Sequence, residues 1–367
     1  MHVGQIVVWQ ASTAGVLAAV GRSDRILITV SVIAGLLLLF TVVRFRHRWL
    51  YEWVATRIRY TARRHTPPRR RRGDPTGVLT LLAPDASVGT VEVDGVPVGV
   101  LEDASGMTVL LEPVGAGTGL VEEDAVTLPP PNAVLPPTSG PGPAVTGQLI
   151  LHTVPRAPVV AGHAASSYAQ LLHGGAPASR RAWFAVRMTR VPGEYSSDDL
   201  RRLLGSAVRR LRRRLRAEGT EMRILDADEL IPLLGTLAHL DDEPGRGAVR
   251  ETWTAWRSPV LQASFRLHRW PDLATHEGRR FLDRLTSVPS LSTTLAITTR
   301  AGGRRADRGD AEVSTVIRLA GSDPAQLKGA AEVLSKAARE SGARLDRLNG
   351  DHRSGLAASL PLAGFPR

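Results

Sequence analysis

Two aspartates separated by one residue, Asp226 and Asp228, are the side chains of this sequence best placed for chemistry. They follow residues 220–226, which predict a strand, and enzymes that act on nucleotide sugars hold a divalent metal with carboxylates in such a position. The alternative is a helix N-cap, because Leu230 opens an apolar stripe and a carboxylate accepts hydrogen bonds from free backbone N–H groups. We favour the cap.

A second acidic group and a glycine-rich segment are the other candidates. Asp241, Asp242 and Glu243 either bind a divalent cation or lie in a solvated loop, and we favour the loop. Residues 115–119 read Gly-Ala-Gly-Thr-Gly, which resembles a phosphate-binding turn. No predicted helix follows them to offer its N-terminus to a phosphate, so we expect a flexible loop there.

The residue inventory offers no other catalytic chemistry. The chain has no Cys, which excludes disulfides, thiolate metal sites and a cysteine nucleophile. None of its ten His lies four residues from another, and the G-x-S-x-G, P-loop and H-E-x-x-H motifs are absent. We therefore predict no catalytic residue, no cofactor and no metal site, and a protein that is not an enzyme.

An apolar run of eighteen residues, 26–43, stands near the start of the chain, and a weaker uncharged run, 3–21, precedes it. A helix rises about 1.5 Å per residue, so the longer run would extend roughly 27 Å, close to the thickness of a bilayer core. The two runs are joined by only four residues. We therefore predict that residues 1–45 form a transmembrane helical hairpin.

Arginines follow this hairpin and set its predicted orientation. Residues 44–72 contain eleven Arg and one acid, a net charge of +10 out of +12 for the whole chain. Basic residues beside a membrane helix stay in the cytoplasm, so we expect a multi-pass protein of the plasma membrane with both termini cytoplasmic. Because the remaining residues carry so little net charge, we expect no nucleic-acid binding.

Aromatic residues are interleaved with these arginines, a pattern typical of the headgroup layer. We predict that residues 46–76 form a basic juxtamembrane helix, over 45–64, and a tether. Its side chains would anchor the chain at anionic lipid headgroups. The predicted membrane-interface anchors are Arg44, Arg46, Arg48, Trp49, Tyr51, Trp53, Arg57 and Arg59.

Beyond Gly77 the pattern changes to short Val- and Leu-rich runs. Residues 77–147 predict a β-rich segment that starts with a strand at 77–82 and ends in a loop rich in Pro and Gly. Residues 148–367 alternate strands and helices, and a short helix is expected near 167–172. Residues 262–349 follow the order strand, helix, strand, strand, helix, strand, the ferredoxin-like βαββαβ pattern, and residues 180–226 fit half of a second such unit.

We therefore predict a membrane-anchored α+β protein whose cytoplasmic domain contains mixed or antiparallel sheets. Its clearest helix is 196–219, which begins at Ser196 or Ser197 and buries one Leu-rich face. Arginines cover the rest of that helix. They either dock an acidic partner or lipid headgroups, or form a solvated face. The predicted docking residues are Arg201, Arg202, Arg209, Arg212, Arg213 and Arg216.

Several stretches together resemble one protein family. They are residues 3–10 (VGQIVVWQ), 47–64 (HRWLYEWVATRIRYTARR), 180–188 (RRAWFAVRM), 249–272 (VRETWTAWRSPVLQASFRLHRWPD) and 356–364 (LAASLPLAG). These are similar to the EccE family, a membrane component of actinobacterial type VII secretion systems. The resemblance implies a non-catalytic structural subunit beside the EccB, EccC and EccD components, with the mycosin protease nearby. A membrane-anchored, metal-dependent transferase that resembles glycosyltransferases and uses Asp226 and Asp228 remains the alternative function.

Overall fold

The structure of the protein is a computed structural model that divides into two compact units, Met1–Arg64 and His65–Arg367. It describes residues 3–364 apart from 22, 46–47, 64, 67–74, 94, 115–142, 155–178, 192, 241–248, 273–274, 277–279, 282–283, 286 and 302–311.

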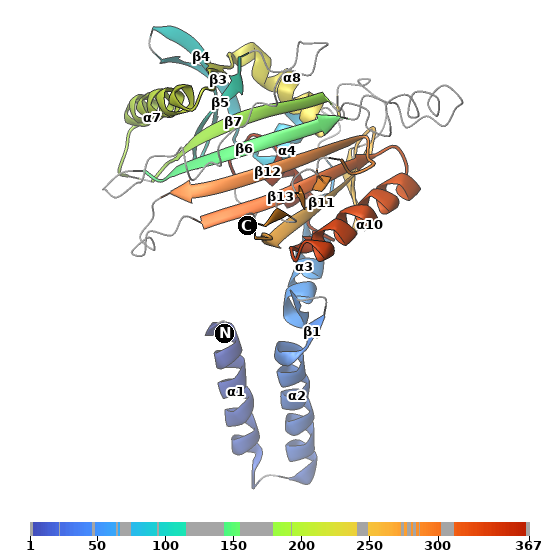
Figure 1. Ribbon diagram of the computed structural model, residues 1–367. Helices are drawn as coiled ribbons and strands as arrows, with labels where there is room; N and C mark the ends of the chain where they lie inside the picture. The colour runs from blue at the N-terminus through green and yellow to red at the C-terminus, as the bar shows by residue number, and fades with distance from the viewer. Residues whose placement is uncertain are drawn as a thin grey trace, which may run out of the picture. The chain divides into compact units, whose positions relative to one another are not determined.

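The first unit contains two packed helices, a short hairpin and a third helix (Figure 1). Gly15 lies where α1 approaches α2, since a Cβ built on it would be 3.9 Å from Val30 Cγ1. This close approach uses the small residues of α1 within the helix pair. The elements are α1 (Val3–Ala19), α2 (Asp24–Val42), β1 (Arg44–Phe45), β2 (Arg48–Trp49) and α3 (Leu50–Ala62).

Within the described residues, no helix combines the length and the apolar character that crossing a bilayer requires. The predicted transmembrane hairpin of residues 3–21 and 26–43 is therefore wrong, and the multi-pass topology that rested on it is unsupported. α1 has 17 residues, and α2 has 19, of which the first two are Asp24 and Arg25.

The predicted continuous helix over 45–64 is also wrong at its start. The chain leaves α2 at Val43, whose ψ of 126° is extended, and Arg44 then pairs with Trp49 in the β1–β2 hairpin. The Leu50 N–H donates to the Val43 carbonyl at 3.0 Å, which closes this hairpin before α3 begins. The basic residues after α2 are therefore divided between a hairpin and a shorter helix.

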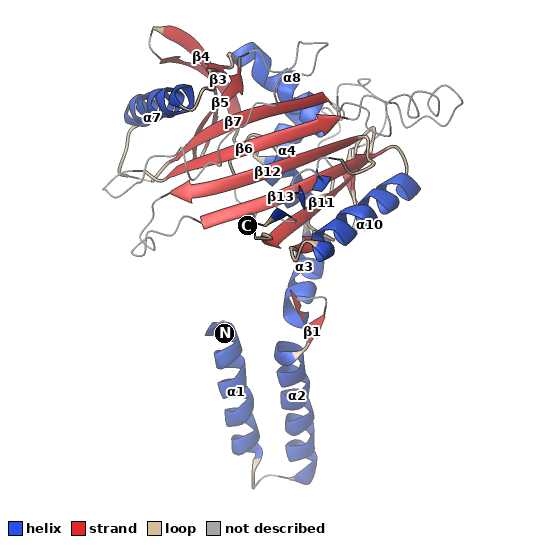
Figure 2. Cartoon of the chain, in the orientation of Figure 1, coloured by secondary structure: helices blue, strands red, loops and turns tan. Residues whose placement is uncertain are grey.

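The second unit is built on one twelve-stranded antiparallel sheet (Figure 2). The strand order is β3-β4-β5-β7-β6-β12-β13-β11-β10-β9, with β8 added to β5 and β14 added to β11. The strands are β3 (Ser87–Val93), β4 (Val96–Asp103), β5 (Gly106–Pro113), β6 (Val145–Val154), β7 (Ser179–Thr189), β8 (Met222–Ile224), β9 (Arg250–Glu251), β10 (Trp256–Arg257), β11 (Leu261–Arg269), β12 (Ser292–Ala301), β13 (Glu312–Gly321) and β14 (Arg344–Arg347).

From either edge of the sheet, the order is a two-stranded hairpin followed by the first, third and second strands of one unit. The sheet therefore consists of two halves with the same topology. In the second half, the order β14-β11-β13-β12 is that of the ferredoxin-like βαββαβ pattern. In the first half, β8-β5-β7-β6 repeats it. A two-stranded hairpin extends each half, β3–β4 on β5 and β9–β10 on β11, and β6 pairs with β12 where the halves meet.

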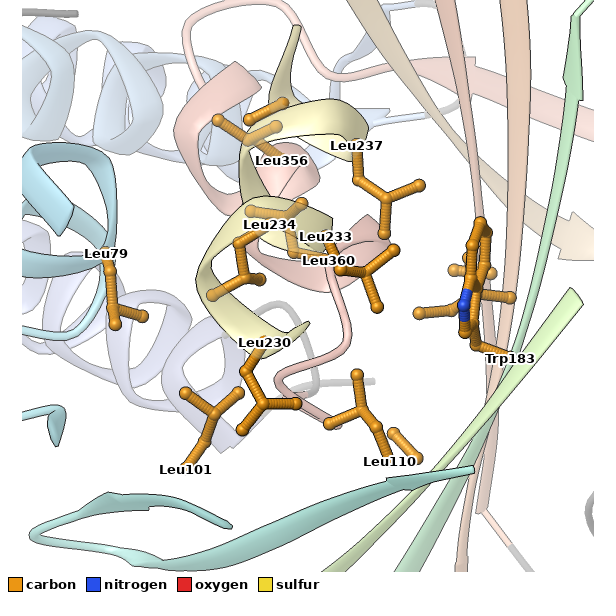
Figure 3. Close-up of a cluster of buried hydrophobic side chains, with 14 of the residues drawn as sticks. Leu79, Leu101, Leu110, Trp183, Leu230, Leu233, Leu234, Leu237, Leu356 and Leu360 are labelled. Carbon is orange, nitrogen blue, oxygen red and sulfur yellow. The ribbon is translucent and has the colours of Figure 1, made fainter. Parts of the chain in front are cut away.

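Helices cover both faces of the sheet, because successive strand residues point to opposite sides. On one face, α7 (Ser197–Ala217) packs over the first half and α10 (Pro324–Glu340) over the second. On the other face, α4 (Pro75–Leu82), α8 (Ala227–Ala238) and α11 (His352–Ser359) share one cluster that includes Trp183 of β7 (Figure 3). Helices α7 and α10 are equivalent in the two halves, because α7 follows β7 and α10 follows β13, the third strand of each half.

The α+β class with a large antiparallel sheet is confirmed. The predicted strand at 77–82 is wrong, since these residues belong to α4, which buries Leu79 and Leu81 against α8. The predicted helix at 167–172 lies outside the described residues. Strands on both sides of the predicted boundary at residue 147 join the same sheet, and that boundary itself stays a prediction.

Candidate functional site

Among the helices that the structure describes in the second unit, α7 carries the highest density of charge. Its start is fixed by a capping box, in which Ser196 Oγ accepts from the Asp199 N–H at 3.1 Å and the Asp199 carboxylate accepts from the Ser196 N–H. Leu200, Leu204 and Leu211 are fully buried among the β5 and β7 side chains. The apolar stripe therefore holds α7 on the sheet and leaves its arginines on the opposite side.

Most predicted docking arginines of α7 have a described partner. Ion pairs join Arg201 to Asp198 at 3.0 Å, Arg202 to Asp199 at 2.7 Å and Arg216 to Glu221 at 2.6 Å. These pairs sit at the two ends of the helix. In the middle, Arg209 donates to Ser206 Oγ at 2.9 Å, and Arg212 donates through Nε to the Met222 carbonyl at 3.1 Å.

The central turns of α7 lack acidic residues altogether, since none occurs between Asp199 and Glu218. Arg210 and Arg213 are exposed, and neither forms an ion pair within the residues that the structure describes. Arg210 was not among the predicted docking residues, although its spacing of three from Arg213 places both on one side of the helix. The exposed basic face in the middle of α7 is thus centred on Arg209, Arg210 and Arg213.

The predicted membrane-interface anchors are spread over three elements. Tyr51 and Trp53 lie half-buried in the first turn of α3, and Arg57 and Arg59 are exposed farther along it. Arg59 Nε approaches the Ala55 carbonyl at 3.4 Å, one turn back on the same helix. Of the remaining anchors, Arg44 lies in β1, Arg48 and Trp49 lie in β2, and Arg46 is outside the described residues.

The carboxylates first considered for metal chemistry hold a helix end instead. Asp226 is the N-cap of α8, where its carboxylate accepts from the Glu229 N–H at 3.0 Å, and Glu229 accepts from the Asp226 N–H. Asp228 is exposed in the first turn, where a negative charge suits the helix dipole. Among the described residues, no three His, Asp or Glu side chains gather to hold a metal, and residues 241–243 lie outside them.

A buried polar cluster crosses the region where the two halves meet, and the sequence did not indicate it. Arg318 on β13 is 1% exposed, donates from Nε to Ser359 Oγ at 2.7 Å and also donates to Gln262 Oε1. Burial lowers the pKa of Arg318 to about 9. No carboxylate pairs with it in the described part of the chain. The only sequence signal is an arginine within the apolar run 315–321.

Two histidines complete this cluster. His152 Nδ1 lies 2.9 Å from Thr294 Oγ1, His239 Nε2 lies 2.7 Å from Ser292 Oγ, and the two ring centroids are 6.1 Å apart. Burial, followed by the nearby charge of Arg318, lowers the pKa of each histidine to about 3. Both rings are therefore neutral at pH 7, and each has a hydroxyl side chain as a hydrogen-bond partner.

A hollow of about 450 Å³ borders α4, β3 and α8, and its lining offers hydroxyl and apolar side chains without a charged group. It therefore lacks the convergent titratable residues expected of an active site.

The comparisons with known proteins identify one family. Residues 176–267, which run from before β7 into β11, match the family described as "Putative type VII ESX secretion system translocon, EccE". The matched segment contains α7 and α8 and reaches across both halves of the sheet. No curated protein matches the chain. Through residues 176–267 the chain is thus similar to the EccE family, a component of type VII secretion systems, and this match supports the family predicted from the sequence.

Proposed function

We propose that this protein is a non-catalytic structural subunit that stabilises the type VII secretion complex at the plasma membrane. The EccE match over residues 176–267 carries the proposal. The placement of Asp226 as a helix cap supports a role without catalysis, because it removes the best candidate for a metal-binding carboxylate. We further propose components of the EccB, EccC and EccD families as its partners, with the mycosin protease nearby.

The apolar surface of the first unit supports contacts of this kind. On α2, the side chains of Ile28, Leu36 and Leu39 are each about 60% exposed. Large exposed apolar patches are rare on proteins that act alone and mark surfaces that are covered in an assembly. We propose that this surface of α1 and α2 packs against other components of the complex, and that the basic residues 44–59 contact anionic lipid headgroups beside it.

Purification of the secretion complex from native membranes in mild detergent tests the structural role. We expect the double variant Leu36→Asn, Leu39→Asn to reduce recovery of this chain with the complex at least tenfold, because polar side chains weaken packing at an apolar contact. A matched control, Val313→Asn with Val333→Asn, changes two exposed apolar residues of the second unit. Recovery of the control should equal that of the unaltered chain.

Full recovery of the Leu36→Asn, Leu39→Asn variant would remove α2 as a contact surface. Recovery of the unaltered chain only as a free monomer, with the other components assembled, would contradict the structural role itself.

A further inference from the structure

The two halves of the sheet provide an internal comparison for the charge on α7. Helices α7 and α10 follow equivalent strands, β7 and β13, and lie on the same face of the sheet. Each buries one stripe of Leu and Ala side chains: α7 contributes Leu204, Ala207 and Leu211, and α10 contributes Leu327, Ala330 and Leu334. Their packing tasks are therefore the same.

Their exposed faces differ in charge. On α10, Lys328 lies 3.9 Å from Glu332 and Lys336 lies 3.8 Å from Glu340, so its charges alternate in sign at a spacing of four residues. Opposite charges at this spacing stabilise a helix. The fold therefore accepts a balanced charge pattern on a helix in this position.

On α7 the same spacing places like charges together. Arg209 and Arg213, Arg210 and Arg214, and Arg212 and Arg216 are each four residues apart on neighbouring turns. Like charges at this spacing destabilise a helix, and the helix dipole favours cations only in the last turn. The preference of this chain for Arg over Lys explains which basic residue occurs here, but not why the acids of α10 have no counterpart. A binding function accounts for an arrangement that stability alone disfavours.

The chemistry of the face favours an acidic polypeptide over a membrane or a nucleic acid. The guanidinium group binds carboxylates through paired, charge-assisted hydrogen bonds. Helix α7 has no aromatic residue, whereas lipid interfaces favour Trp and Tyr, and single-stranded nucleic acids stack on aromatic rings. The aromatic residues that do accompany arginines in this chain, Tyr51, Trp53 and Tyr60, lie on α3.

We propose that the exposed face of α7 centred on Arg209, Arg210 and Arg213 is a docking surface for an Asp- and Glu-rich segment of a partner protein. The proposal names a partner class that membership of the EccE family does not supply, and it is independent of the contacts proposed for α2.

A binding measurement on the full chain in mild detergent tests the proposal. The probe is a fluorescent ten-residue Glu and Asp peptide at 150 mM salt, followed by anisotropy. The variant Arg209→Gln, Arg210→Gln, Arg213→Gln should bind it at least tenfold more weakly. The control variant Lys328→Gln, Lys336→Gln, Arg339→Gln removes the same charge from exposed positions of α10 and should change binding less than twofold. Thermal melting establishes that both variants are folded.

Three results would overturn the proposal. An equal loss in the α10 variant would show that the peptide responds only to net charge. Tighter binding of anionic vesicles or of single-stranded DNA than of the peptide, abolished by the α7 substitutions, would assign the face to a lipid surface or a nucleic acid. Peptide binding that survives all three α7 substitutions would place the acidic segment elsewhere on the chain.

Discussion

His152 and His239 show how a few residues near the centre of the sheet link stability to pH. Burial is the main cause that disfavours protonation of both rings; the charges of Arg318 and Arg181 add to it at His152, and those of Arg318 and His152 add to it at His239. In its neutral form, the His152 ring forms a hydrogen bond with the Thr294 hydroxyl, and the His239 ring forms one with the Ser292 hydroxyl. Folding therefore excludes two protons that the unfolded chain would bind in mild acid.

We predict that the second unit loses stability as the pH falls below about 6.5. A histidine with a pKa of about 3 when folded and about 6.5 when unfolded costs stability as pH decreases through this range. Between pH 7.5 and pH 5.0 the expected loss is about 2 kcal/mol for each histidine. Urea unfolding at the two pH values measures it, in a range where most carboxylates stay charged.

The double variant His152→Asn, His239→Asn should unfold with a much smaller difference between the two pH values. His276→Asn, at an exposed position, serves as control and should keep the full difference. An unchanged pH dependence in the double variant would mean that other groups bind the protons.

The same cluster shows where residue-level prediction from the sequence ends. The capping role of Asp226 could be predicted, because a cap depends on residues three positions apart. Arg318 could not be recognised as a buried residue, since its partners Gln262 and Ser359 lie 56 and 41 residues away. The pairing of β11 with β13 and the packing of α11 on the sheet bring them together. The burial of the Arg318 charge therefore cannot be predicted from the residues next to it in the sequence.

At the level of single elements, the sequence predicts helix or strand more reliably where the periodic apolar pattern extends over many residues. The 3.6-residue period and the caps of α7 predict it almost to its ends. Residues 77–82 form too short an apolar run to separate a buried strand from a buried helix, and they form α4. The transmembrane hairpin prediction was wrong, since no helix among the described residues combines the length and the apolar character that crossing a bilayer requires.

The start of α8 provides a test at this scale. We predict that Asp226→Ala lowers the free energy of unfolding by about 1 kcal/mol, the usual value of an N-cap. Asp228→Ala should lower it by less than about 0.5 kcal/mol, because Asp228 is exposed and acts only through the helix dipole. Urea unfolding of the three proteins gives both values.

If Asp226 and Asp228 instead shared a divalent metal, both alanine variants would abolish the stabilisation that added Mg²⁺ or Mn²⁺ gives the unaltered chain. A rise in the melting temperature with either metal, lost in both variants, would therefore contradict the cap assignment and restore the transferase alternative.

At the scale of the whole molecule, the repeated strand order of the two halves explains which parts of the fold could be predicted from the sequence. The βαββαβ order of residues 262–349 is local enough to read, and it matches β11 to β14. The first half follows the same order, but the segment between its β5 and β6 ends in a stretch rich in Pro and Gly, so the sequence did not show that these strands belong to one unit. The pairing of β6 with β12, which joins the halves, has no local signal at all.

The chain has two basic regions, residues 44–72 and α7, and we expect them to bind different ligands. Residues 44–72 carry +10 of the net +12 and include aromatic side chains, whereas α7 is basic without them. Each arginine close to an anionic membrane contributes about 1 kcal/mol, and amphipathic aromatic residues favour the headgroup layer. The first region is therefore the one expected to contact lipid.

We predict that the full chain binds phosphatidylglycerol vesicles more tightly than phosphatidylcholine vesicles, and that salt weakens this preference. The variant Arg44→Gln, Arg48→Gln, Arg57→Gln, Arg59→Gln should reduce binding to the anionic vesicles on the order of a thousandfold at low salt, since four lipid contacts of about 1 kcal/mol each are lost. Vesicle flotation measures both effects. The variant Arg209→Gln, Arg210→Gln, Arg213→Gln is the control, because it removes three arginines from α7 and should retain the preference. A preference that survives the first variant, or disappears equally in the control, would show that residues 44–59 are not the lipid contact.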